Sequence, residues 1–264
     1  MSDTPWVPGP VIGMVHLPAL PGAPDYDGDR DAIRERAVAD AKRLESGGVD
    51  ALLVENFGDA PFYPTDVPDH VVSEMTAAVG DVVDAVSVAV GVNVLRNDGT
   101  AALSVAAAAG ASFVRVNVLA GAAATDQGLI EGAAHDLLRL RERIDADVAI
   151  CADVDVKHAT PLSDRPIGER AADVLGRAGA DAVIVSGAAT GAETPAADLR
   201  AVRKAVGEGA TVLVGSGATA ETLPDLLSVA DGAIVGTALK EGGETTAPVD
   251  RERVERVVAA AKRR

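Results

Sequence analysis

Eight short apolar runs, each followed by a longer stretch with helical spacing, predict a single (β/α)₈ barrel for this 264-residue chain. The runs are rich in β-branched residues and continuously apolar, which is typical of parallel strands buried on both faces. The repeats are evenly spaced, and no composition shift or linker divides residues 1–264, so we expect one domain. A doubly wound open sheet is the alternative architecture for the same alternation.

The expected strands are the apolar runs at residues 11–17, 51–55, 88–94, 113–118, 148–153, 182–186, 211–214 and 233–235. The expected helices are residues 30–46, 68–83, 99–109, 126–144, 167–178, 196–206, 220–229 and 250–262. Glycines at 47–48, 110, 179 and 209 mark helix ends that favour a left-handed residue. Thr125 or Asp126 either caps the fourth helix or faces a ligand. Residues 18–29 form a long loop, which in a compact domain often works as a lid.

The composition is that of a globular protein with an aliphatic core. Apolar residues make up 48 % of the chain and aromatic residues only 2 %, so Ala, Val, Leu and Ile must fill the interior. The single cysteine, Cys151, excludes an internal disulfide and a cysteine-rich zinc site. The start of the chain does not read as a signal peptide, and no apolar run reaches the roughly 20 residues of a membrane span. We therefore expect a cytoplasmic protein without membrane insertion.

Acidic residues outnumber basic ones by 40 to 24, which gives a net charge of −16. Nucleic-acid binding needs a basic patch that neutralises phosphates, so this balance argues against nucleic acid as a partner. Asp outnumbers Glu by 26 to 14, and only five of the basic residues are Lys. The pattern predicts a halophilic protein, whose surface carboxylates keep it hydrated in high salt. A GC-rich genome with an acidic bias would give the same composition.

Polar side chains collect where the first five expected strands end, and in such barrels the active site lies at those carboxyl ends. They are His16, Glu55, Asn56, Asn93, Arg96, Asn97, Asp98, Arg115, Asn117, Asp153, Lys157 and His158. The opposite rim carries mostly Gly, Ala and Asp. This asymmetry favours a ligand-binding site over a purely structural protein.

Small residues follow the later strands, and they predict a phosphate site. Gly187, Gly215, Ser216, Gly217, Gly236 and Thr237 are the candidates, with Thr190 as a ligand-facing residue nearby. Missing side chains let backbone N–H groups approach an anion, and a helix that starts after the eighth strand would add its positive end. Barrels often hold phosphate between these last two loops, although ordinary tight turns also use glycine.

Four residues are candidates for proton transfer. Glu55, Asp98 and Asp153 would converge across the barrel mouth, where carboxylates raise one another's pKa or bind a divalent cation such as Mg²⁺. Each is also a candidate for a salt bridge with a neighbouring arginine, and Asp98 for capping the third helix. His16 ends the first strand and is a candidate acid, base or substrate contact.

Two of the five lysines, Lys157 and Lys240, are expected near the mouth. The pair Lys157-His158 lies in the loop after the fifth strand and is suited to binding an anion. A desolvated lysine there would instead be able to form a Schiff base with a carbonyl compound.

The same segments resemble the BtpA family, which includes the SgcQ-like proteins, over nearly the full chain. The motifs that carry the resemblance are IGMVHL at 12–17, LPG at 20–22, ENFGD at 55–59, NVLRND at 93–98, FVRVN at 113–117, DQG at 126–128, ADV at 152–154, VKH at 156–158, TG at 190–191, GSG at 215–217 and VGT at 235–237. The resemblance implies a phosphate-binding TIM barrel. The family takes its name from photosystem I biogenesis, and nucleosidase activity has been inferred for its SgcQ-like members.

Two functions follow as hypotheses. The first is an enzyme for a small phosphorylated metabolite, a sugar phosphate or nucleotide, that cleaves a glycosidic bond or isomerises its substrate. Asp153 or Glu55 would stabilise charge on the sugar and His16 would protonate the leaving group, so Asp153→Asn is expected to abolish turnover with little loss of fold. A Schiff-base aldolase that uses Lys157 is a variant. The second is a non-catalytic assembly or regulatory factor, which would need an exposed apolar patch. In either case we expect a homo-oligomer.

Overall fold

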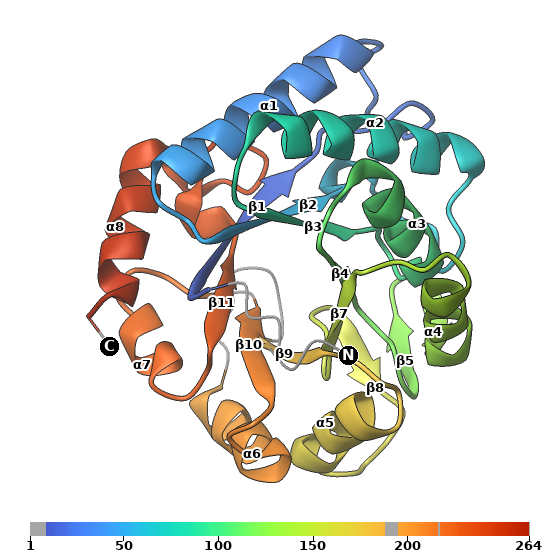
Figure 1. Ribbon diagram of the computed structural model, residues 1–264, viewed down its shortest axis with the longest axis vertical. Helices are drawn as coiled ribbons and strands as arrows, with labels where there is room; N and C mark the ends of the chain where they lie inside the picture. The colour runs from blue at the N-terminus through green and yellow to red at the C-terminus, as the bar shows by residue number, and fades with distance from the viewer. Residues whose placement is uncertain (1–8, 188–194, 216, 264) are drawn as a thin grey trace.

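The computed structural model, which describes residues 9–187, 195–215 and 217–263, confirms the closed barrel (Figure 1). Its parallel strands are β1 (Val11–His16), β2 (Ala51–Glu55), β3 (Ala89–Asn93), β4 (Phe113–Val116), β7 (Ala149–Asp153), β9 (Ala182–Ser186), β10 (Thr211–Gly215) and β11 (Gly232–Val235). Each strand pairs with the next in this order, and β11 pairs with β1 to close the ring. The expected runs therefore become neighbouring strands of one barrel.

Helices surround the barrel in the expected alternation (Figure 1). They are α1 (Arg30–Ser46), α2 (Asp69–Ala85), α3 (Gly99–Ala109), α4 (Ala134–Arg143), α5 (Ile167–Gly176), α6 (Ala196–Val206), α7 (Leu223–Leu227) and α8 (Arg251–Ala261). Short 3₁₀ turns are η1 (Phe57–Asp59), η2 (Thr237–Leu239) and η3 (Glu241–Gly243). After α6 the left-handed residue is Gly207, at φ +81°, and not the expected Gly209. No described helix has the length and apolarity needed to cross a membrane.

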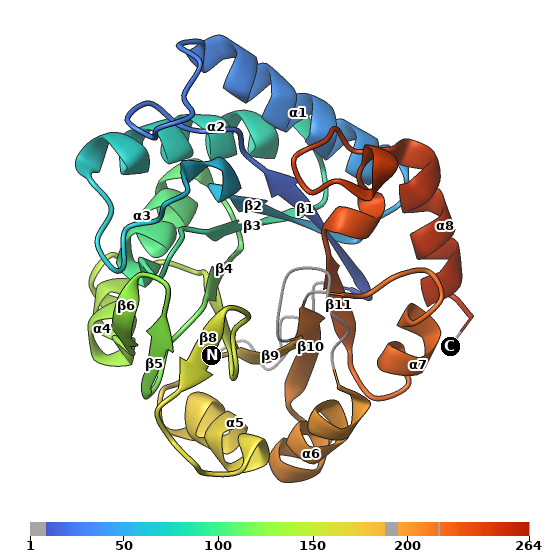
Figure 2. The same cartoon turned by 180° about the vertical axis from the view of Figure 1, so that it is seen from behind.

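The sequence reading was wrong at the start of the fourth helix. The expected helix at 126–144 is only α4, and a hairpin of β5 (Ala122–Thr125) and β6 (Gly128–Glu131) precedes it. With β8 (Ala159–Pro161) these strands form a small three-stranded sheet between α4 and α5 (Figure 2). Thr125 therefore does not cap a helix; its hydroxyl donates to the carbonyl of Gly128 across the turn. The hairpin is favoured because it buries Ala123 and Ile130 against Val118 and Val156.

Inside the barrel, one apolar cluster fills the space below the mouth. It consists of Ile12, Met14, Ala51, Leu53, Phe113, Cys151, Ala182, Ile184, Leu213 and Ile234. A larger cluster packs the outer faces of the strands against the helices. Because side chains alternate along a strand, the continuous apolar runs supply both clusters at once.

Aspartates at the amino-terminal rim tie neighbouring strands together. Each lies directly before a strand and accepts a hydrogen bond at 2.8–2.9 Å from a backbone N–H at the start of the preceding barrel strand. The pairs are Asp50 with Val11, Asp181 with Ile150 and Asp231 with Val212. This rim is therefore polar for structural reasons.

The expected lid after β1 is packed down at its start. Leu17 and Leu20 are buried, and the backbone N–H of Leu20 donates to Asp59 Oδ1 at 2.8 Å. Gly58 lies directly against Pro18 and Ala19, where a β-carbon would have no room. The first half of this loop thus fixes the end of β2.

Candidate active site

A ring of eight residues covers the apolar interior at the carboxyl ends of the strands. Each lies two positions beyond an interior residue of its strand, so strand alternation turns it toward the barrel axis. The ring consists of His16, Glu55, Asn93, Arg115, Asp153, Ser186, Gly215 and Gly236. His16 is in register with Glu55, and Glu55 with Asn93, on three adjacent strands. Six ring positions carry a polar side chain, and the other two, Gly215 and Gly236, carry none.

His16 and Glu55 form a buried pair on one side of this ring. The His16 Nε2 to Glu55 Oε1 distance is 4.0 Å, and the two side chains are 6 % and 2 % exposed. The imidazole also packs on the ring of Phe57, with centroids 4.9 Å apart. Burial, together with the positive charges of Lys240 and Lys157, lowers the pKa of His16 well below its ordinary value, so the imidazole is neutral at pH 7.

Three polar atoms of the ring have no hydrogen-bond partner among the described residues. They are His16 Nδ1, Glu55 Oε1 and Asn93 Oδ1. Buried polar atoms are nearly always hydrogen-bonded, because desolvation without a partner is costly. Because they lie on three adjacent strands, these atoms are candidates for hydrogen bonds to a bound ligand.

Asp153 is held differently, since its carboxylate is fully used within the protein. It forms a bidentate ion pair with Arg115, with both N–O distances 2.9 Å, and accepts further hydrogen bonds from Asn117 at 3.2 Å and Ser186 at 2.7 Å. The Arg115 and Asp153 side chains are 4 % and 0 % exposed. Of the two roles expected for Asp153, the structure therefore supports the salt bridge to an arginine and not a cluster of carboxylates. Its carboxylate fixes the Arg115 guanidinium beneath the mouth.

Asp98 is also bound within the protein and does not meet the other carboxylates. Its Oδ1 caps α3 by accepting from the Ala101 N–H at 2.8 Å, and its Oδ2 accepts from the Val67 N–H at 2.8 Å. Within the described ranges, no three His, Cys, Asp or Glu side chains form a group that could hold a metal ion. The described donors therefore do not fit the Mg²⁺ site that the carboxylate spacing suggested.

Two of the predicted amides hold loops together. Asn56 accepts from the Leu95 N–H at 2.7 Å and donates to Asp59 at 3.0 Å. Asn97 pairs with both backbone groups of Val118, at 2.7 and 3.0 Å. Both side chains connect the ends of neighbouring strands, which is a positioning role.

Asn93 and Asn117 instead join the interior network. Asn93 Nδ2 donates to the carbonyl of Arg115 at 3.0 Å and to Asn117 Oδ1 at 3.2 Å. Because Asn117 in turn donates to Asp153, the network runs from β3 across to β9. It orients the unpartnered Oδ1 of Asn93 beside Glu55.

A cavity of about 190 Å³ opens beside this ring, between the ends of β1, β10 and β11. Its polar lining includes His16, Arg115, Lys157, Thr237 and Thr245, and Met14, Ile234 and several Gly and Ala residues form much of the remaining wall. We call it the mouth cavity. Its charged lining residues are cations, and Lys157 Nζ forms no hydrogen bond or ion pair with the described residues.

The glycines of the predicted phosphate loops contribute to this cavity in two ways. A β-carbon at Gly215 would meet Ile184 at 2.7 Å and Ser186 Oγ at 3.1 Å, and one at Gly236 would meet His16 at 3.0 Å. These two glycines therefore make room for ring side chains. Gly217, at φ +77°, lines the cavity.

The remaining predicted phosphate and ligand residues are placed unevenly. Thr237 lines the cavity and begins η2, a three-residue 3₁₀ turn that directly follows the eighth barrel strand. Gly187 follows β9 and is buried. Thr190 and Ser216 lie outside the described residues.

Charged residues after β3 and β7 border the mouth. Arg96 is buried, and its Nη2 donates to the carbonyl of Lys157 at 2.5 Å, which ties the two loops together. His158 is exposed in the loop, at φ +57°. Lys240 is instead fully buried, and its Nζ lies 3.3 Å from Asp40 Oδ2 of α1, so it anchors that helix.

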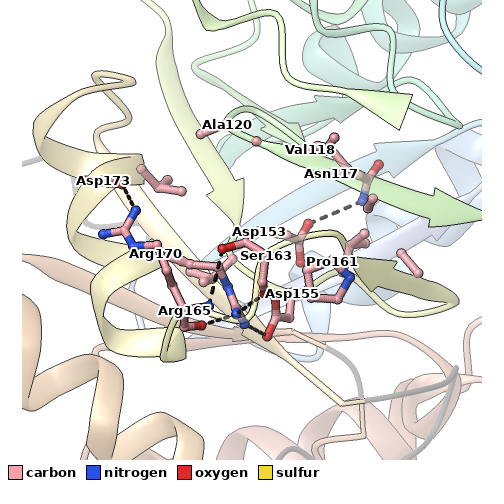
Figure 3. Close-up of a pocket in the computed structure, with 17 residues that line it drawn as sticks. Asn117, Val118, Ala120, Asp153, Asp155, Pro161, Ser163, Arg165, Arg170 and Asp173 are labelled. Carbon is pink, nitrogen blue, oxygen red and sulfur yellow. Dashed lines mark hydrogen bonds and ion pairs between the residues drawn. The ribbon is translucent and has the colours of Figure 1, made fainter. Parts of the chain in front are cut away.

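A second cavity, of about 140 Å³, lies between the small sheet and α5 (Figure 3). Its wall includes Asn117 and Asp153 of the interior network. Its two arginines are already paired, Arg165 with Asp173 and Arg170 with Asp155. We call it the side pocket; unlike the mouth cavity, it presents no cation that lacks a carboxylate partner among the described residues.

Sequence reasoning missed Ser186 and Phe57 as members of the site. Ser186 could have been predicted from side-chain alternation, because on every strand the ring residue lies two positions after a residue of the barrel interior. The contact of Phe57 with His16 had no sequence signal, since it depends on how η1 folds over β1.

Comparison with known proteins places this arrangement in a family. The BtpA family model matches residues 8–263. The chain is 46 % identical over 251 residues to the photosystem I biogenesis protein BtpA of Synechocystis, covering 95 % of this chain and 87 % of that protein. It is 47 % identical over 253 residues to an uncharacterized protein of Thermococcus kodakarensis, covering 96 % and 95 %.

Solved structures support the same fold. N-(5'-phosphoribosyl)anthranilate isomerase from Pyrococcus furiosus aligns with a TM-score of 0.59 at 16 % identity, covering 97 % of this chain and 100 % of that one. Thiamine phosphate pyrophosphorylase from the same organism aligns with a TM-score of 0.61 at 15 % identity, covering 97 % and 96 %. At such low identity these similarities show a TIM barrel and nothing about the reaction. By its family match and its close relatives, the chain belongs to the BtpA family.

Proposed function

We propose that this protein is an enzyme that acts on a small phosphorylated metabolite, a sugar phosphate or a nucleotide, in the mouth cavity. The observation that carries the proposal is a cationic cavity lined by His16, whose Nδ1 has no hydrogen-bond partner among the described residues. Glu55 and Asn93, on the next two strands, each keep a further polar atom without a partner. The cationic cavity is suited to binding an anion, and the unpartnered polar atoms are suited to contacting the reacting group of a substrate.

The phosphate would lie against the loops after β10 and β11. Gly217, Gly236 and Thr237 leave their backbone accessible to the cavity, and Lys157 adds a positive charge. Anion sites in TIM barrels commonly use these two loops. The isomerase and the pyrophosphorylase that share the fold carry phosphorylated compounds in their names, which supports the same ligand class here.

His16 and Glu55 would carry out proton transfer. A neutral imidazole can accept or donate a hydrogen bond at the substrate, and the free Oε1 of Glu55 can accept a proton from it. Isomerisation and cleavage of a glycosidic bond both need such a pair. Asp153 would act through Arg115, whose guanidinium it holds in place.

A non-catalytic assembly role is the second candidate, favoured by the 46 % identity to a protein named for photosystem I biogenesis. The small sheet would provide the docking surface. Leu129 is 55 % exposed and Leu162 is 60 % exposed, and strand pairing places both on the same face as Ala122 and Ala124.

Thermal unfolding in the presence of ligands tests the first proposal. The panel contains sugar phosphates, nucleotides and inorganic phosphate, with each organic compound also supplied without its phosphate. At about 100 times its dissociation constant, a ligand stabilises the protein by about 2.7 kcal/mol, a rise of several degrees in Tm. Stabilisation by a phosphorylated compound and not by its dephosphorylated form is expected.

The variant Glu55→Gln separates binding from chemistry. It keeps the size of the side chain but removes the base, so the ligand should still raise Tm while turnover is lost. If no phosphorylated compound changes the Tm of a cooperatively unfolding protein, the enzyme proposal fails. A Leu129→Asp/Leu162→Asp variant would then test the docking role of the small sheet.

A further inference from the structure

The five lysines of the chain have very different surroundings. Lys42, Lys204 and Lys262 are exposed, and Lys240 is fully buried against Asp40. Lys157 is half-buried and lines the mouth cavity. Among the described residues, no carboxylate lies within salt-bridge distance of its Nζ. Lys240 therefore has a structural role, whereas the amine of Lys157 is available to a ligand.

The backbone of Lys157 is held by the buried Arg96, which donates to its carbonyl at 2.5 Å. This contact fixes the loop after β7 at the edge of the cavity. Two of the charged groups that face the amine are the guanidinium groups of Arg115 and Arg96, while Glu55 and Asp153 supply the opposing charge. Burial is the main influence, and it lowers the pKa of Lys157. A larger fraction of this amine is therefore unprotonated at neutral pH than for an ordinary lysine.

We infer that Lys157 is a nucleophile that forms an imine with the carbonyl carbon of an open-chain sugar phosphate. The inference rests on the proposed function, and it selects carbonyl compounds among the phosphorylated ligands. The phosphate would bind at the loops after β10 and β11, which line the same cavity as Lys157. The carbonyl end of a short sugar phosphate would then face the amine.

The step balances without a cofactor. The Nζ lone pair forms a bond to the carbonyl carbon, while the carbonyl π electrons move to oxygen, which takes up a proton. The amine loses one proton, and the hydroxyl leaves as water after a second protonation. Amine, carbonyl compound and one proton thus give an iminium ion and water, with no oxidation or reduction.

Glu55 would exchange these protons, because its Oε1 has no hydrogen-bond partner and lies 4.0 Å from His16, which lines the cavity together with Lys157. An iminium ion withdraws electrons from the neighbouring carbon. The reaction that follows would therefore be proton transfer or carbon–carbon bond cleavage next to the carbonyl. This assigns the enzyme to isomerisation or aldol chemistry rather than to cleavage of a glycosidic bond.

Reductive trapping tests the inference on the full-length protein. The protein is incubated with glyceraldehyde 3-phosphate or with unphosphorylated glyceraldehyde, sodium borohydride is added, and the modified lysine is located by peptide mass spectrometry. We expect a single adduct on Lys157 with the phosphorylated aldehyde. Its rate should exceed that of glyceraldehyde by about tenfold, which corresponds to roughly 1.4 kcal/mol of phosphate binding.

Two matched variants control the site. Lys157→Arg keeps the charge but cannot form an imine, and should lose the adduct. Lys204→Arg changes an exposed lysine and should retain it. The few lysines of the chain make any background labelling easy to assign.

The outcomes distinguish failure of the imine proposal from failure of the phosphate-site proposal. No adduct on Lys157, in a protein whose Tm glyceraldehyde 3-phosphate still raises, overturns the imine and leaves the phosphate proposal intact. Equal labelling of the exposed lysines, or no adduct with either aldehyde, also overturns it. An adduct on Lys157 at equal rates with both aldehydes supports the imine and contradicts the phosphate site.

Discussion

Asp153→Ala removes the carboxylate that accepts four hydrogen bonds beneath the barrel mouth. The change leaves Arg115 with a buried positive charge and no anion to balance it, because the Arg115 side chain is 4 % exposed. It also removes the acceptor for Asn117 and Ser186. We therefore expect a loss of fold stability as well as of function, although the sequence suggested that this residue could be neutralised with little effect on the fold.

Removing one partner of a buried ion pair costs about 3–5 kcal/mol. For a chain of this size, each kcal/mol lowers Tm by about 2–4 °C, so a fall of about 6–20 °C is expected. Asp153→Asn should also destabilise the protein, since its amide group would place a donor where Arg115 and Asn117 already donate.

Urea unfolding followed by circular dichroism measures this loss. The double variant Arg115→Met/Asp153→Leu provides the control, because apolar side chains of similar size remove the unpaired charge, and it should be more stable than Asp153→Ala. A loss below about 1 kcal/mol, the range of an exposed ion pair, would refute this description of the network.

Three further predictions follow from named contacts. As the pH falls below about 6.5, the free energy of unfolding should decrease by up to about 1.4 kcal/mol per pH unit, because His16 is protonated in the unfolded chain but stays neutral in the folded one. In urea titrations at several pH values, His16→Asn should weaken this pH dependence. The same pH dependence in the variant would contradict the prediction. Glu55→Gln should slow turnover of the identified substrate by about 100-fold or more with little change in its dissociation constant, measured by steady-state kinetics and calorimetry. Asp231→Ala should cost about 1–3 kcal/mol, because it removes the acceptor of the Val212 N–H and of Arg203 Nη2. Ligand affinity should not change, since this contact lies at the opposite rim.

The barrel was predictable because the signal for each strand is local. The runs at residues 51–55 and 182–186 match β2 and β9 to the residue. Four consecutive apolar residues in each are typical of a parallel strand that is buried on both faces. The hairpin of β5 and β6 was not predictable in the same way. Its residues are mostly small, and only the buried contacts of Ala123 and Ile130 decide their conformation.

The candidate site was predictable in its residue types but not in their pairing. Their positions at strand ends made His16, Glu55 and Asp153 equally good candidates for catalytic residues. The structure separates them, because Asp153 is bound to Arg115 while Glu55 keeps an atom without a partner. That distinction depends on contacts between β4 and β7, which no spacing in the sequence shows. The structural role of Lys240 was hidden for the same reason, since its partner Asp40 is 200 residues away in the sequence.

A crystal structure with ribose 5-phosphate bound would test the central claim most directly. We expect the phosphate within hydrogen-bond distance of backbone N–H groups after β10 and β11, with the sugar carbonyl end toward Lys157, His16 and Glu55. A phosphate in the side pocket, or one held by surface residues away from Gly217 and Thr237, would contradict it.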